Sequence, residues 1–186
     1  MRIIAGRHRG TQLADVGQGD AQAHLRPTSD RVRENLFNIL EGGRFGRVVQ
    51  DAHVLDLFAG TGALGLEALS RGAAHVTFVD NGAVALRLLK ANIEKLRRAQ
   101  DCVVVKARAD ELPKASRGFS LVFLDPPYGT GLGQSALLAA RRNGWIEPSA
   151  LVVWEDATAQ LPPEGFLACD QRRYGQTWIT LLKVKP

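Results

Sequence analysis

The sequence predicts an α/β protein with a doubly wound, seven-stranded sheet that ends in an antiparallel C-terminal hairpin. Three observations carry this prediction. Apolar strands alternate with helical segments between residues 54 and 154, a glycine turn joins the first of these strands to a helix, and the last two strands have no helix between them. A chain of 186 residues with 45% apolar content is expected to form a single domain (1–186), with an N-terminal extension (1–45) on a core (50–186).

The composition favours a cytoplasmic protein that contacts a polyanion. The chain has 24 basic and 19 acidic residues, a formal charge of +5 and a pI near 9.6. Its two cysteines, Cys102 and Cys169, match no metal-binding spacing and argue against a disulfide-built fold, so no metal is expected. No apolar run reaches the roughly 18 residues of a membrane span, and the basic N-terminus lacks the apolar segment of a signal peptide.

A small β-hairpin is predicted over residues 1–13, N-terminal to the core. In it, residues 2–4 pair with residues 11–13. Arg7, His8 and Arg9 lie at its tip, where they can contact phosphates; a solvated turn is the alternative. Residues 14–26 show no periodicity and predict a loop.

A helix is predicted after Arg26, with Thr28 or Ser29 as its N-cap and two glycines (42–43) at its end. Its buried stripe is expected to contain Val32, Leu36, Ile39 and Leu40. The opposite face is expected to be solvated and to carry Arg31, Arg33 and Glu34.

The remaining elements follow the alternation of strand and helix. Strands are predicted at 54–58, 75–80, 103–105, 119–124 and 150–154, and their apolar runs are typical of parallel strands buried on both faces. Helices are predicted after the glycine turn, at 83–98 and at 132–142. The terminal hairpin is expected to join strands 166–172 and 178–184 through a turn near 174–175.

The glycine turn after the first strand predicts a ligand site. Gly60, Gly62 and Gly65 match the G-x-G-x-x-G pattern, which favours a dinucleotide whose pyrophosphate lies at the helix N-terminus. However, Asp56 precedes the turn, and its carboxylate would repel phosphates. S-adenosyl-L-methionine (SAM) carries an ammonium and a sulfonium but no phosphate, so SAM is the predicted ligand. An NAD-dependent oxidoreductase and a glycine turn without ligand are the alternatives.

A second motif, formed by Asp125, Pro126, Pro127 and Tyr128, ends the fourth strand at the same carboxyl edge of the sheet. An exocyclic nucleobase amine is a poor nucleophile because its lone pair is conjugated to the ring. Asp125 and the Pro126 carbonyl supply two acceptors that can orient such an amine, and the prolines restrict the backbone that presents them. Tyr128 offers a face on which a flipped base can stack. A rigid strand-end turn is the alternative.

Three stretches together resemble the bacterial 16S ribosomal RNA guanine-N2 methyltransferase family: residues 1–6, residues 26–40 and residues 125–128. This is a family of class I SAM-dependent methyltransferases with a Rossmann-like fold. The resemblance implies direct, in-line methylation of the N2 amine of a flipped-out guanine in 16S rRNA. Neither motif contains a cysteine, so a covalent intermediate is not expected. The expected partner is 16S rRNA, within a small ribosomal subunit or an assembly intermediate, and the protein is expected to be a monomer.

The resemblance also implies roles for individual residues. Asp80 would accept from both ribose hydroxyls, and Asp110 would reach the adenine edge, although an ordinary helix N-cap is its alternative. The full set expected to bind SAM is Asp56, Phe58, Ala59, Gly60, Thr61, Gly62, Asp80, Asn81, Ala109, Asp110, Arg26 and Thr28. The set expected to contact RNA is Arg2, Arg7, Arg9 and Arg31.

Three other functions are also compatible with the sequence. A DNA adenine or cytosine amino-methyltransferase shares the second motif, but no separate target-recognition segment is visible in the chain. An NAD-dependent oxidoreductase follows from the literal glycine pattern. An RNA-binding assembly factor without turnover would retain the same fold.

Overall fold

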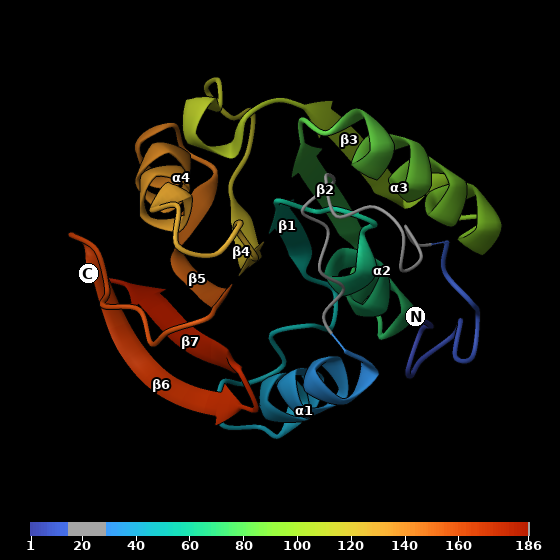
Figure 1. The fold of residues 1–186 in the computed structure, drawn as a ribbon, viewed down its shortest axis with the longest axis horizontal. Helices are drawn as coiled ribbons and strands as arrows, with labels where there is room; N and C mark the ends of the chain where they lie inside the picture. The colour runs from blue at the N-terminus through green and yellow to red at the C-terminus, as the bar shows by residue number, and fades with distance from the viewer. Residues whose placement is uncertain (15–28, 186) are drawn as a thin grey trace.

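The computed structural model describes residues 1–14 and 29–185 and contains one seven-stranded sheet with the order β3-β2-β1-β4-β5-β7-β6 (Figure 1). Strands β1 to β5 are parallel to one another, and β7 pairs antiparallel with both β5 and β6. The predicted doubly wound sheet with an antiparallel C-terminal hairpin is therefore confirmed. The strands are β1 (His53–Leu57), β2 (His75–Asp80), β3 (Cys102–Lys106), β4 (Phe119–Leu124), β5 (Ile146–Asp156), β6 (Phe166–Tyr174) and β7 (Thr177–Val184).

Helices cover both faces of the sheet. Alternate residues of β4 show the division: Leu121 and Phe123 pack on one side, Val122 and Leu124 on the other. The first side is covered by α1 (Asp30–Glu41), α2 (Ala63–Ser70) and α3 (Ala83–Leu96). The second is covered by α4 (Leu132–Arg142) and the short helix η2 (Ala109–Glu111); another short helix, η1 (Ala99–Asp101), precedes β3.

Strand β3 departs from the prediction of strands buried on both faces. It lies at the end of the sheet, and Val103 is 45% exposed. An apolar run of three valines does not reveal whether a strand is central or at an edge, because strand position depends on pairing with distant segments. Among the residues that the structure describes, no helix has the length and apolar character that crossing a membrane requires.

The N-terminal extension packs against the end of α2. Residues 1–13 form the predicted hairpin in outline, with a single bridge between Arg2 and Gln12. The backbone N–H groups of Ile4 and Ala5 donate to the Glu67 carboxylate at 2.7 and 3.0 Å. Gly6 is required at its position because its φ is +77° and a Cβ there would lie 1.9 Å from the Ser70 carbonyl oxygen.

The face of helix α1 that was expected to be solvated is partly buried. Ser29 is the N-cap, and its Oγ accepts from the Val32 N–H at 3.3 Å. Arg33, expected to be solvated, is fully buried. Its Nη2 donates to Asp30 Oδ1 at 2.9 Å and to the Arg2 carbonyl oxygen. The N-terminal hairpin covers this side of α1, and the periodicity of the helix alone does not reveal such a contact.

Candidate active site at the carboxyl edge of the sheet

The glycine turn connects β1 to α2, and packing explains two of its glycines. Gly62 is the N-cap of α2 with φ +81°, and a Cβ there would lie 2.4 Å from Leu89 Cδ1. A Cβ on Gly65 would lie 2.5 Å from Phe78 Cε1, so this glycine allows α2 to approach β2 closely. The G-x-G-x-x-G spacing therefore serves the turn and helix packing, without requiring a pyrophosphate.

Asp56 lies beneath this turn, near the end of β1. It is 2% exposed, and its Oδ2 accepts from the Gly65 N–H at 2.9 Å. This hydrogen bond satisfies one free donor in the first turn of α2. Burial raises the pKa of Asp56 to about 8, the nearby Asp80 also raises it, and the Gly65 hydrogen bond opposes the shift. A cation brought next to Asp56 would favour its ionised form.

Asp80 ends β2 and links two turns at the carboxyl edge. Its Oδ2 accepts from the Gly60 N–H and its Oδ1 from the Gly82 N–H, both at 2.8 Å. A carboxylate oxygen has two lone pairs, so each can still accept from a ligand hydroxyl. Asn81 follows directly and is exposed. The structure therefore fixes Asp80 next to the glycine turn, as the parallel strands predict.

Asp110 lies beyond β3 in the short helix η2. Its carboxylate forms two contacts with Arg108, at 2.7 and 3.1 Å, and the Arg108 hydrogen bonds hold the pKa of Asp110 below its ordinary value. Arg108 occupies the N-cap position of η2, so the alternative that Asp110 caps a helix is wrong. Ala109, which precedes it, is buried.

The second motif starts directly after β4 and lies beside the end of β1. The Asp125 N–H donates to the Leu57 carbonyl oxygen at 3.4 Å. Asp125 is half-buried, Pro126 is buried and Pro127 is exposed. Thr130 Oγ1 donates to the Pro127 carbonyl oxygen at 2.7 Å and closes the turn that follows. The two motifs, about 65 residues apart in the sequence, therefore meet at one edge of the sheet.

Glu155 is a further candidate at this edge, and it was not among the residues expected from the sequence. It lies near the end of β5, is 4% exposed, and its Oε1 accepts from the Tyr128 hydroxyl at 3.2 Å. Burial and the Glu155 charge raise the pKa of Tyr128, so the phenol stays protonated and donates. A signal was present: an acidic residue follows the buried run 151–154 at the carboxyl edge.

The remaining candidates do not form one cluster. Arg26 and Thr28 lie outside the described residues. Arg31 is exposed on α1. Arg2 pairs with Asp30, with 3.5 Å between Arg2 Nε and Asp30 Oδ2. Arg7 and Arg9 lie on the hairpin tip near the end of α2, at the opposite edge of the sheet from the two motifs. Within residues 1–14 and 29–185, no group of three His, Cys, Asp or Glu residues is arranged to hold a metal ion.

The sheet order and the acidic residues at its carboxyl edge place the chain among the Rossmann-like methyltransferases. A solved structure of a putative methyltransferase from Escherichia coli superimposes with a TM-score of 0.84 and 35% identity, covering 100% of this chain and 98% of that one. A structure of a putative methylase from Haemophilus influenzae gives a TM-score of 0.76 at 32% identity, covering 99% of this chain and 98% of that one.

Sequence comparisons identify the family. A family model described as "Conserved hypothetical protein 95" matches residues 1–183. Ribosomal RNA small subunit methyltransferase D of Escherichia coli is 41% identical over 156 residues, covering 83% of this chain and 74% of the relative. A putative rRNA methyltransferase of Bacillus subtilis is 34% identical over 190 residues, covering 98% of both chains. The chain belongs to the ribosomal RNA small subunit methyltransferase D family, which confirms the resemblance found in the sequence.

Proposed function

We propose that this protein transfers a methyl group from SAM to the exocyclic N2 amine of a guanine in 16S ribosomal RNA. The observation that carries this proposal is the position of Asp125 beside the end of β1, set by the 3.4 Å bond between its N–H and the Leu57 carbonyl oxygen. That bond places the half-buried Asp125 beside Leu57, the residue directly before the turn 58–62. An amine oriented by Asp125 would lie beside a cofactor held by the turn.

The residues at this edge fit SAM better than a dinucleotide. Asp80 and Asp56 accept from the Gly60 and Gly65 N–H groups, so these two backbone donors are not free to bind a pyrophosphate. In the proposed complex, Asp80 accepts from the ribose hydroxyls, the turn 58–62 faces the methionine part, and Asp110 reaches the adenine edge. When bound, SAM supplies an electrophilic methyl group on a sulfonium. Contacts of Arg26 and Thr28 with SAM are also part of the proposal.

The base would be held by the second motif. Asp125 and the Pro126 carbonyl accept from the two amine N–H bonds, so the nitrogen lone pair can point at the methyl carbon. Bound SAM would give up its methyl group and leave as S-adenosylhomocysteine. Asp125 would hold the amine in line and take the amine proton, which becomes acidic only as the N–C bond develops. The Tyr128 ring stacks on the flipped base, and Glu155 holds its hydroxyl. Positioning supplies most of the catalysis.

The comparisons support the choice of RNA as substrate. Relatives from Escherichia coli and Haemophilus influenzae are named ribosomal RNA small subunit methyltransferases. We extend that substrate to this chain, with the small ribosomal subunit or an assembly intermediate as the physiological partner. In the same proposal the enzyme works in the cytoplasm as a monomer and without a metal ion.

An incorporation assay tests the proposal. The purified protein and methyl-labelled SAM are incubated with one of three substrates in separate reactions. The substrates are 16S rRNA, small subunits from cells lacking the enzyme, and duplex DNA. We expect label in an RNA-containing substrate and none in DNA. Equal labelling of DNA would favour the DNA amino-methyltransferase. RNA binding without any label would favour the assembly factor, and calorimetric binding of NAD but not SAM would favour the oxidoreductase.

The raised pKa of Asp56 predicts a pH-dependent affinity for SAM. With a pKa of about 8, Asp56 is protonated at pH 6, and binding next to a cation requires loss of that proton. Affinity should therefore rise between pH 6 and 7.5, by up to about twenty-fold for one proton released. An α-amino group, with an ordinary pKa near 7.7–8.0, stays largely charged in this range.

Calorimetric titration across this pH range measures the effect, with Asp56→Asn as the comparison. The amide cannot ionise, so its affinity should be lower and nearly independent of pH. A wild-type affinity that stays constant from pH 6 to 7.5 would contradict a direct role for the Asp56 carboxylate in holding the cofactor.

A further inference from the structure

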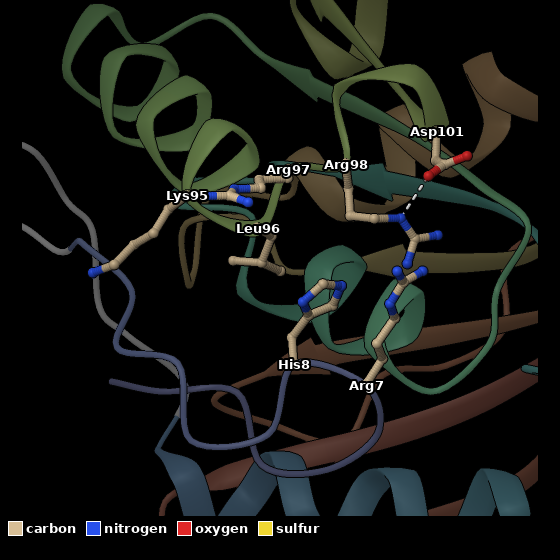
Figure 2. Close-up of a pocket in the computed structure, with 7 residues that line it drawn as sticks. All are labelled: Arg7, His8, Lys95, Leu96, Arg97, Arg98 and Asp101. Atoms are coloured by element: carbon tan, nitrogen blue, oxygen red, sulfur yellow. Dashed lines mark hydrogen bonds and ion pairs between the residues drawn. The ribbon is translucent and has the colours of Figure 1, made fainter.

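A cavity of about 500 Å³ lies at the other edge of the sheet, between the N-terminal hairpin and the end of α3 (Figure 2). We refer to it as the basic pocket; its lining residues are Arg7, His8, Lys95, Leu96, Arg97, Arg98 and Asp101. It is separate from the two motifs, because α3 begins just after Asp80 and runs back along the sheet before it ends at the pocket. At 1.5 Å per residue, the helix spans about 20 Å.

Two segments about ninety residues apart build the basic pocket, and the fold holds both in place. On the hairpin side, the Arg7 N–H donates to the Ser70 carbonyl oxygen at 2.8 Å, and the His8 N–H to Ser70 Oγ at 2.9 Å. On the other side, Arg98 donates through Nε to Asp101 at 2.5 Å and through Nη1 to the Leu69 carbonyl oxygen at 3.3 Å. The cationic groups are therefore presented by fixed backbone.

The basic pocket has too little negative charge to balance its cations. Among the described residues that line it, four are basic and Asp101 alone is acidic, and Asp101 already pairs with Arg98. Figure 2 shows the Arg7 side chain extending toward Arg98, with the His8 imidazole beside it. Two guanidinium groups that approach each other repel unless an anion lies between them.

The surroundings of His8 show the same excess of positive charge. Its Nε2 is buried and has no hydrogen-bond partner in the part of the chain that the structure describes. Burial, followed by the charges of Arg98 and Arg7, lowers the pKa of His8, so the imidazole is neutral near pH 7. An anion in the pocket would offset the charges of the two arginines and so raise the pKa of His8.

We propose that the basic pocket binds a backbone phosphate of the RNA substrate, at the end of α3 that lies away from Asp80. This rests on the proposed function for the choice of RNA. Phosphodiesters suit the pocket because guanidinium groups bind phosphate oxygens in a bidentate way. Arg87 and Lys90 are exposed on α3 between the two sites, so an RNA strand could follow this helix. In this proposal Arg7, an expected RNA contact, binds the same phosphate as Arg98.

A paired substitution tests the proposal. Arg7→Ala/Lys95→Ala removes two exposed charges and leaves Arg98, which has structural contacts, in place. The matched control is Arg142→Ala/Lys185→Ala, which removes the same charges from exposed positions outside the pocket. We expect the pocket variant to bind deproteinised 16S rRNA on the order of ten-fold more weakly, and the control nearly as well as wild type.

Salt dependence separates the removal of a phosphate-binding group from a general charge effect. The slope of log affinity against log salt should fall by about 0.7 for each single-strand phosphate that the pocket variant no longer neutralises, and by less in the control. In methylation assays, the change should lie in KM for RNA rather than in the rate at saturating RNA. Equal affinities and slopes for the two double variants would overturn the proposal while leaving the proposed function intact.

A second measurement works without any methyl transfer. The His8 imidazole resonances are titrated by NMR with and without inorganic tripolyphosphate as the probe. The pKa of His8 should rise on binding in the wild type and stay unchanged in the pocket variant. No rise in the wild type would count against the pocket. If no RNA is methylated but the pocket variant still loses RNA affinity, the proposed function fails and the phosphate site stands.

Discussion

Replacing Asp125 with asparagine should slow methyl transfer by about a thousandfold and leave the affinity for SAM nearly unchanged. Asparagine keeps the size of the side chain and its backbone link to Leu57, but it removes the charged acceptor. An amide also presents N–H donors toward an amine that needs acceptors. Single-turnover methyl transfer to RNA measures the rate, and calorimetry measures SAM affinity on the same preparation.

Asp51→Asn is the matched control for this prediction. Asp51 is exposed, lies before β1 at the other end of the strand, and has a positive φ that asparagine tolerates. Its substitution should change the transfer rate less than twofold, within the ordinary range for surface changes. Turnover by the Asp125 variant at the wild-type rate would remove the carboxylate from the mechanism.

The largest loss of stability is expected from Glu67→Ala. Glu67 is fully buried in α2, and its carboxylate accepts from the N–H groups of Ile4 and Ala5 and from Arg71 Nε at 2.7 Å. Removing it leaves two backbone donors without an acceptor and takes one of two carboxylate partners from the mostly buried Arg71 guanidinium. The free energy of unfolding should fall by about 3–5 kcal/mol, measured by urea denaturation.

Glu41→Ala provides the control, because Glu41 pairs with the same Arg71, at 2.6 Å. The Glu41 side chain is 40% exposed, so solvent screens the pair and its loss should cost about 1 kcal/mol or less. If both variants lost the same stability, the buried network between α2 and the N-terminal hairpin would not be the main anchor of that hairpin.

The sequence predicted the features that local patterns encode. The order of strands and helices, the Ser29 cap among two alternatives, and the turn near Gly175 all depend on neighbouring residues. The meeting of the two motifs was also predictable, because parallel strands bring their carboxyl ends to one edge. Asp80 and Asp125 therefore lie where the pattern placed them.

Features set by distant contacts were not predictable in the same way. Arg33 looked solvated on its own helix but is covered by the N-terminal hairpin, and its carbonyl partner belongs to Arg2. Glu155 became a candidate only when its contact with Tyr128, from another strand end, was visible. The basic pocket likewise joins Arg7 to Arg98 across about ninety residues, which no sequence period connects.

Mapping the modified nucleotide tests the central claim most directly. Ribosomal RNA from cells with and without the protein is digested and analysed by mass spectrometry, with the Asp125→Asn variant as a third sample. The account predicts one guanine in 16S rRNA that carries an N2-methyl group only when active protein is present. Identical 16S rRNA in all three samples, or a methyl group on another base or atom, would contradict it.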